Sequence, residues 1–177
     1  SCFWQNAFRI NEICKLVKTF HKKIYFYNEY TENIMNNLMK CDKTLDLSPN
    51  DIVTSDNLLR VRSEDLVILL LGRGASMFYE FQKLALNKND DRRIVLGKDD
   101  IFINVALPTP TLETLATKSM DTLYRNKCEV VWIKSKEISS MHAYQDDLRF
   151  FMSTLKPQYY VPVRGRYVQM LNNAKLA

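Results

Sequence analysis

The stretch LVILLLGRGAS, residues 66–76, joins six consecutive apolar residues to a glycine-containing turn. The apolar residues do not alternate with polar ones, which is typical of a central strand covered on both faces. Gly72 and Gly74 mark a turn, and the apolar spacing that follows predicts a helix over residues 77–86. A buried strand that leads directly into a helix is the basic unit of an α/β protein.

The rest of the chain repeats this alternation. Apolar spacing predicts helices over residues 6–20, 28–40, 112–126, 144–155 and 167–176. Strands are predicted over residues 22–26, 101–106, 129–133 and 159–163, while residues 47–62 read as a connection with a helical turn after Ser48-Pro49. Strands that alternate with helices imply right-handed crossovers, so the predicted fold class is α/β with a mainly parallel sheet.

Composition excludes several classes of protein. The longest apolar run has six residues, far below the roughly 18 needed to span a membrane, and no signal-peptide pattern is present. We therefore expect no membrane partner and a cytoplasmic location. No C-x-x-C, H-x-H-x-D-H or H-E-x-x-H spacing connects the cysteines and histidines, so no cofactor or metal site made by this chain alone is expected; these residues are Cys2, Cys14, Cys41, Cys128, His21 and His142.

The charge of the chain favours an anionic partner. Its 25 basic and 20 acidic residues give a formal charge of +5, and basic residues are dense in the last 45 positions. Gly72-Arg73-Gly74 follows a predicted strand and precedes a helix, so its backbone N–H groups could receive a phosphate. It lacks the third glycine of a dinucleotide fingerprint and the Lys-Ser/Thr of a P-loop, and a simple tight turn is the competing interpretation.

A second candidate phosphate site lies at KPQYYVPVRGRY, residues 156–167, where the predicted strand 159–163 leads to a glycine between Arg164 and Arg166. This stretch resembles K-P-K-Y-F-I-P-V-H-G-E-Y-R in ribonuclease J, a β-CASP member of the metallo-β-lactamase superfamily. Residues 71–76, LGRGAS, resemble its T-G-S-Q-G-E, and Ser140-Met141-His142-Ala143 resembles its S-G-H-G/A. Further similarities at residues 5–10, 67–69, 108–113 and 174–177 keep the same order along nearly the whole chain.

The resemblance implies a Rossmann-like three-layer β-CASP domain over residues 1–133. Residues 134–177 would be the return segment that in the family rejoins the metallo-β-lactamase domain, whose N-terminal part these 177 residues do not contain. Active members of the family carry zinc. Three positions depart from the family pattern, because Ser76 stands where the family has an acid, Arg164 where it has a metal-binding His, and Arg166 where it has a Glu. A guanidinium offers no lone pair, so Arg164 cannot ligate a metal ion.

Three functional hypotheses follow. In the first, the chain is the β-CASP region of a ribonuclease J-like RNA-processing protein that is itself non-catalytic. It would bind RNA or act as a partner subunit of an active ribonuclease, in a homo- or hetero-oligomer. RNA phosphates would contact Arg73, Ser140, His142, Arg164 and Arg166.

In the second hypothesis, the chain belongs to a metal-dependent ribonuclease whose upstream domain supplies the metal site and whose His142 positions the phosphate. The third is a plain nucleotide-binding Rossmann domain at residues 72–76. The two C-terminal arginines could equally lie on a solvated rim.

Overall fold

The computed structural model describes residues 1–41, 45, 47–133 and 143–176. They fall into two compact units, Ser1–Ile138 and Ser139–Ala177. Within the described residues, no helix has the length and apolar character that crossing a bilayer requires.

The first unit alternates strands and helices as expected from the sequence. Its helices are α1 (Ala7–Thr19), α2 (Glu29–Cys41), α3 (Gly74–Ala85) and α4 (Glu113–Arg125), and 3-10 turns cover Pro49–Asp51, Ser55–Arg60, Ser63–Asp65 and Pro110–Leu112. Its strands are β1 (Cys2–Phe3), β2 (Lys23–Phe26), β3 (Ile52–Val53), β4 (Leu66–Leu69), β5 (Leu71–Gly72), β6 (Ile101–Asn104) and β7 (Glu129–Trp132). The prediction missed β1 and β3, which are too short to show a period of two.

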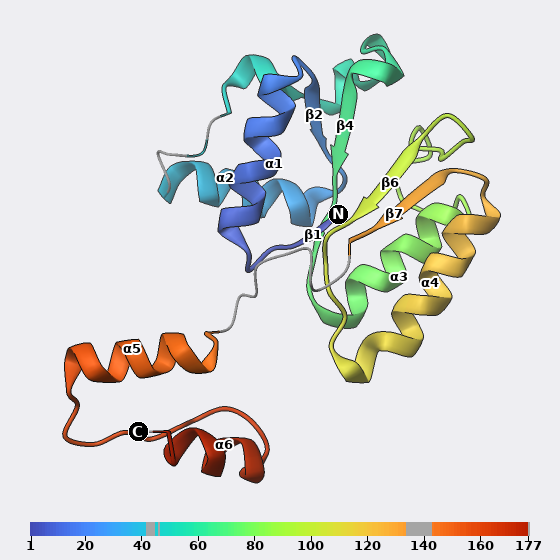
Figure 1. Cartoon of the computed structure of the whole chain (residues 1–177). Coiled ribbons are helices and arrows are strands. Elements are labelled where there is room, and N and C mark those ends of the chain that lie inside the picture. The colour runs from blue at the N-terminus through green and yellow to red at the C-terminus, as the bar shows by residue number, and fades with distance from the viewer. Residues whose placement is uncertain (42–44, 46, 134–142, 177) are drawn as a thin grey trace. The chain divides into compact units, whose positions relative to one another are not determined.

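Every strand pair in this unit is parallel, as predicted. The paired groups are β3-β2-β4, β1-β5 and β6-β7. The Ser1 nitrogen donates to the Ile103 carbonyl oxygen (2.7 Å) and Val105 N donates to the Ser1 carbonyl oxygen (3.1 Å), which joins β1 to β6. The three paired groups, the two Ser1 hydrogen bonds and the chain continuity from β4 to β5 place the strands in the order β3, β2, β4 with β5, β1, β6, β7. Figure 1 labels five of these strands, β2, β4, β1, β6 and β7.

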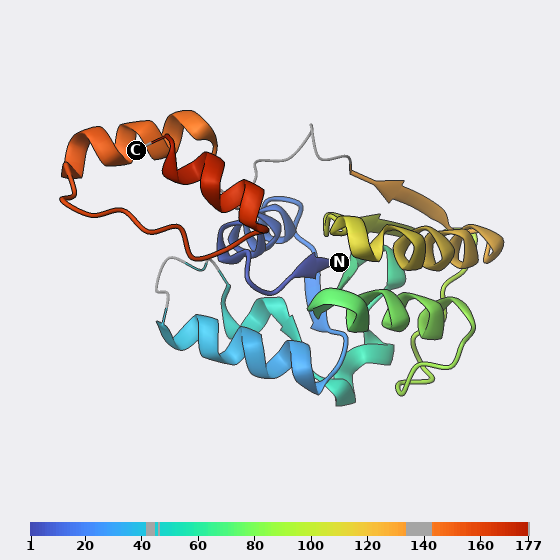
Figure 2. The ribbon, with the colours of Figure 1, turned by 90° about the horizontal axis from the view of Figure 1, so that it is seen from below.

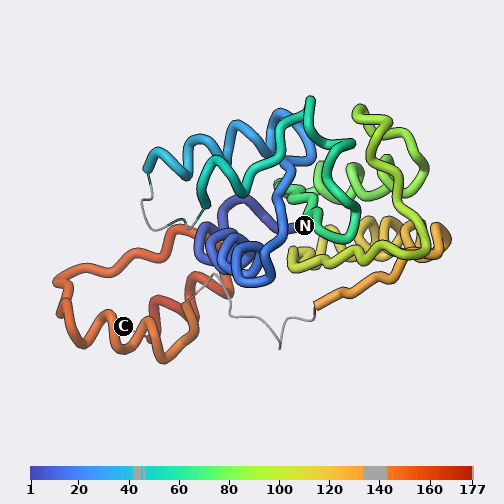
Figure 3. The backbone as a smooth tube through the Cα atoms, turned by 90° about the horizontal axis from the view of Figure 1, so that it is seen from above, coloured from blue at the N-terminus to red at the C-terminus, as the bar shows by residue number. Residues whose placement is uncertain are grey.

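Helices cover the two faces of this sheet and make a three-layer unit. Helices α1 and α2 lie on one side of the strands, and α3 and α4 lie on the other (Figures 1, 2 and 3). Alternate strand residues belong to different cores: Ile24 and Phe26 pack in the core with α1 and α2, whereas Tyr25 packs in the core with α3 and α4. The predicted α/β fold with a parallel sheet is confirmed.

Two details near the sheet centre differ from the prediction. The predicted single strand over residues 66–71 is divided at Leu70, because β4 pairs with β2 and β5 pairs with β1. Helix α3 begins at Gly74, three residues earlier than expected. The early start brings the helix against the strand end, and a Cβ placed on Gly72 would lie 2.6 Å from the Met77 Cβ. Glycine at position 72 is what permits this close approach.

The second unit contains α5 (Gln145–Leu155) and α6 (Tyr167–Ala174), as the sequence predicted. The strand predicted over residues 159–163 is wrong: this segment pairs with no described strand. Val161 and Val163 are 75% and 85% exposed, so the alternating apolar residues of this segment do not pack against the rest of the unit. Among the described residues of the unit, Met152 is the only buried apolar side chain. The unit is held partly by the Tyr160 hydroxyl, which donates to Asn173 Oδ1 (2.9 Å).

Candidate phosphate-binding edge

The first candidate site lies where the sheet reverses its winding direction. Strand β5 leads into α3 on one face, and its neighbour β1 leads into α1 on the opposite face. Because both strands are parallel, their carboxyl ends meet at the same edge, and the two following loops diverge there. Such a topological switch point is where open α/β sheets bind ligands. Arg73 occupies one of these two loops.

Arg73 is exposed and lies at the N-cap position of α3. Its side chain makes no capping hydrogen bond, and the first turn of α3 contains no acidic residue. Gly74 has φ +53°, a left-handed conformation that favours glycine. The free backbone N–H groups of a helix start attract anions, so this loop presents a positive end together with a guanidinium.

The opposite loop has the same electrostatic character. Helix α1 also has no acidic residue in its first turn, where Arg9 lies, and the Asn6 side chain accepts a hydrogen bond from Arg9 N (3.0 Å). The indole Nε1 of Trp4 is buried without a hydrogen-bond partner among the residues the structure describes. The sequence analysis did not select Arg9. The two-residue strand β1 is too short to be recognised from the sequence, so the switch point that follows it could not be predicted.

Ser76 lies in the first turn of α3, at this edge of the sheet. It cannot supply the negative charge of the acidic residue that the family has at this position. Its hydroxyl donates to the Arg73 carbonyl oxygen (2.7 Å), which engages it in holding the start of α3. A hydroxyl is neutral at neutral pH and carries none of the charge that a carboxylate would bring. The edge at residues 72–76 is therefore positive where the family pattern places a negative charge.

Arg164 and Arg166 belong to the second unit and precede α6. Both are exposed, and neither forms an ion pair with a carboxylate in the part of the chain that the structure describes. The backbone N–H of Arg166 donates to Gln169 Oε1 (2.8 Å), which fixes the turn into the helix. Unpaired exposed guanidinium groups are free to contact an anion. The structure describes Arg73 in one unit and these two arginines in the other. The remaining predicted contacts, Ser140 and His142, lie outside the described residues.

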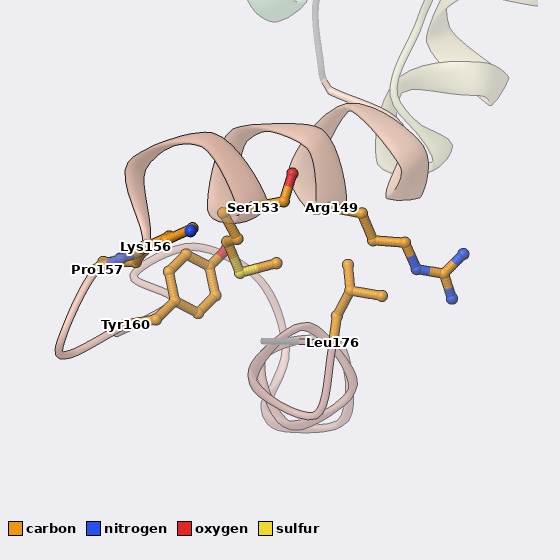
Figure 4. A pocket seen from close by; sticks show the side chains of 7 residues that line it. Arg149, Ser153, Lys156, Pro157, Tyr160 and Leu176 are labelled. Atoms are coloured by element: carbon orange, nitrogen blue, oxygen red, sulfur yellow. The ribbon is translucent and has the colours of Figure 1, made fainter.

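A cavity of about 320 Å³ in the second unit adds no residue to the predicted phosphate contacts. Tyr160 and Leu176 line it from one side of α5, and the Arg149 side chain extends away from Tyr160 (Figure 4). Arg149 pairs with Asp146 at 3.2 Å. Another cavity of about 310 Å³ in the first unit lies beside Glu29 and Glu32, whose charge disfavours a phosphate. Neither cavity contains a residue predicted to bind RNA.

The residues present do not fit a zinc ion. Within the described ranges, no three His, Cys, Asp or Glu side chains gather in a way that could hold a metal. Arg164, at the position where the family has a metal-binding His, supplies positive charge and no lone pair. No chemical step through a metal is assigned to these residues.

Comparison with known proteins bears on both units. Residues 126–177 match the family described as "RMMBL: Zn-dependent metallo-hydrolase RNA specificity domain". The whole chain is 22% identical over 177 residues to Ribonuclease J 2 of Staphylococcus saprophyticus, and 24% identical over 172 residues, 97% of the chain, to Ribonuclease J 2 of Streptococcus pyogenes serotype M3. Ribonuclease J 2 of Staphylococcus aureus strain NCTC 8325 is 20% identical over the full chain.

The chain covers 31% of the length of each of these relatives, so it spans about a third of the proteins it matches. Zinc dependence is a property of the matched family of metallo-hydrolases, and RNA processing is the role of the ribonuclease family to which the relatives belong. The domain match and the similarity along the whole chain support a ribonuclease J-like protein of the metallo-β-lactamase/β-CASP superfamily.

Proposed function

We propose that this chain binds RNA phosphates through arginine side chains and does not itself catalyse hydrolysis. The observation that carries the proposal is Arg164, an exposed cation without a described carboxylate partner at the position of the family's metal-binding His. A cation at this position repels a metal ion and attracts a phosphate. The substitution thus replaces a ligand for the metal with a ligand for the substrate's backbone.

Arginine suits this role because its planar guanidinium forms two parallel hydrogen bonds to one phosphate. Arg164 and Arg166 lie two residues apart, which allows them to contact the same phosphate or two successive ones. Arg73 provides a further contact at the switch-point edge of the first unit, where two helix starts without acidic residues add positive potential. Ser140 and His142 complete the proposed set through the family resemblance.

The exposed apolar surface of the second unit supports a further part of the proposal. We propose residues 1–133 as the β-CASP domain and residues 134–177 as the segment that rejoins a metallo-β-lactamase domain. Phe150, Phe151, Tyr159 and Tyr167 are each more than half exposed in this unit. Monomeric proteins seldom leave so many large apolar groups uncovered, so another domain or a partner subunit would bury them. A ribonuclease J-like subunit is the proposed partner.

The RNA proposal is tested with the full-length protein that contains this chain. Binding of a single-stranded RNA is measured over a series of salt concentrations for wild type and for the double variant Arg164→Ala/Arg166→Ala. Losing two phosphate contacts reduces the slope of log K against log salt by about 1.4 and weakens binding equally for RNAs of different sequence. The matched control, Arg60→Ala/Arg125→Ala, removes the same charge from two exposed arginines of the first unit and leaves the slope unchanged.

Equal slopes for wild type and the Arg164/Arg166 variant would remove these arginines from the RNA site. The non-catalytic part has its own test, in which the full-length protein is supplied with zinc or manganese and a 5′-monophosphate RNA. We expect no turnover. Turnover that is present in wild type and abolished by His142→Ala would instead assign metal-dependent ribonuclease activity to the protein.

A further inference from the structure

The break between β4 and β5 leaves one buried backbone group without its regular partner. Phe26 pairs with Leu69, and Tyr27 N donates to the Leu69 carbonyl oxygen (2.9 Å). In a regular parallel ladder, the next bond would run from Leu71 N to the Tyr27 carbonyl oxygen. The chain turns into α2 after Tyr27, so that ladder ends. Leu71 is only 2% exposed, so water from the solvent cannot reach its N–H group and take the place of the missing acceptor.

The side chain of Thr31 replaces the missing strand. Leu71 N donates to Thr31 Oγ1 (3.1 Å), and the Thr31 hydroxyl donates onward to Asn28 Oδ1 (2.9 Å). Asn28 Oδ1 also accepts from Thr31 N (2.9 Å), which fixes the start of α2. Thr31 is fully buried, so its hydroxyl has no solvent to exchange with. The first turn of α2 is thereby joined to β5 by a short chain of hydrogen bonds.

On its other side, β5 is held by β1. Cys2 N donates to the Leu70 carbonyl oxygen (3.0 Å) and Trp4 N to the Gly72 carbonyl oxygen (3.2 Å). Leu71 and Gly72 are therefore fixed between β1 and the Thr31 hydroxyl, and Arg73 is the next residue. Among the described residues, the Arg73 side chain makes no capping hydrogen bond, and its carbonyl oxygen accepts from the Ser76 hydroxyl (2.7 Å). The two-sided attachment of β5 therefore acts together with the start of α3 to set the position of Arg73 at the switch point.

We propose that Thr31 is a positioning residue for the Arg73 phosphate contact. This inference rests on the proposed RNA binding. Losing the hydroxyl leaves the buried Leu71 N–H unpaired, and β5 moves to find another acceptor. Arg73 then shifts away from the phosphate. The role passes through the Thr31 oxygen alone, so a side chain that keeps the oxygen and loses the methyl group preserves it.

The test uses Thr31→Val, which keeps the shape but removes the oxygen, and Thr31→Ser, which keeps the oxygen. RNA affinity and its salt slope are measured on the full-length protein at a temperature where each variant is folded. We expect Thr31→Val to weaken binding about two- to thirtyfold and to reduce the salt slope by about 0.7, the value for one phosphate on a single strand. Thr31→Ser retains the wild-type slope.

Arg73→Ala separates this inference from the proposed function. If Arg73→Ala weakens binding and Thr31→Val does not, the positioning role is wrong while the Arg73 contact stands. If Arg73→Ala has no effect, the Arg73 contact fails and the positioning role fails with it. In the Arg73→Ala background, Thr31→Val should weaken binding no further, and an equal second loss would overturn the inference. Hydrogen exchange at the Leu71 amide should accelerate in Thr31→Val and not in Thr31→Ser.

Discussion

The close contact between β5 and α3 makes Gly72→Ala the sharpest stability test of the fold. The added Cβ would lie 2.6 Å from Met77 Cβ and 3.1 Å from Met77 Cα. Carbon atoms pack best at about 3.5–4.0 Å, so α3 must retreat by about 1 Å. The same helix carries the fully buried Phe78 and Phe81 into the core. Overpacking of about 1–3 kcal/mol and the loosened core contacts together reduce the free energy of unfolding by about 2–4 kcal/mol.

Urea unfolding of the chain measures this loss, with an expected midpoint decrease of about 1–2 M at an unchanged slope. Two other glycines supply matched controls. At Gly97 the added Cβ would meet only Asp100 Oδ2 at 3.7 Å, so Gly97→Ala should change stability by less than about 0.5 kcal/mol. At Gly74 space is open but φ is +53°, so Gly74→Ala should lose about 1–2 kcal/mol through backbone strain alone.

The order Gly72, Gly74, Gly97 in decreasing loss is the expected result. Met77→Ala removes the Cγ contact at 2.8 Å but keeps the shortest contact, with Cβ at 2.6 Å, and the backbone Cα at 3.1 Å, so it should not rescue Gly72→Ala. A Gly72→Ala variant as stable as Gly97→Ala would refute the close packing of helix and strand, and rescue by Met77→Ala would show that the flexible end of the side chain, not the backbone separation, sets the limit.

Two further predictions concern the first unit. The hydrogen bond from Arg93 holds the pKa of Asp91 at about 2, below its ordinary 3.8, so the stabilisation is complete above pH 3.8 and is lost as pH falls toward 2. Unfolding free energy measured from pH 5 to pH 2 should fall more steeply in wild type than in Asp91→Asn, and parallel curves would contradict this. Phe81 is fully buried and meets the rings of Phe78 and Phe102 edge to face at 5.5 and 4.9 Å, so Phe81→Ala should lower the unfolding free energy by about 3–5 kcal/mol. The exposed Tyr79→Ala is its control, and similar losses for both variants would argue against the ring cluster as the centre of the core.

The sequence predicted the helices and the longer strands because their apolar spacing is set by the faces they bury. The sequence could not predict the break at Leu70. Residues 66–71 are all apolar, and nothing in such a run shows where the strand changes its partner. The 159–163 segment shows the opposite failure. Its alternating Tyr159, Val161 and Val163 have the period of a strand, yet a strand exists only where another strand supplies hydrogen bonds.

The candidate site was predictable in part. A glycine-flanked arginine after a buried strand pointed to Arg73, and the structure places this residue at the helix start, exposed and without a capping bond. The importance of that place depends on β1, a two-residue strand whose partner lies about 70 positions along the chain. The role of Thr31 could not be predicted from the sequence either, because nothing distinguishes it from any other helical threonine until its hydrogen bonds are known.

The joining of β1 between β5 and β6 also constrains how the protein is made. Ser1 bonds to Ile103 across a separation of 102 residues. At about 5–20 residues per second, a ribosome needs roughly 5–20 s to synthesise that interval. During this time β1 lacks its neighbour β6, so the edge of β1 that faces away from β5 remains open to other chains. Slow translation through residues 70–105 would prolong this vulnerable period and should increase aggregation of the nascent protein without changing the stability of the finished one.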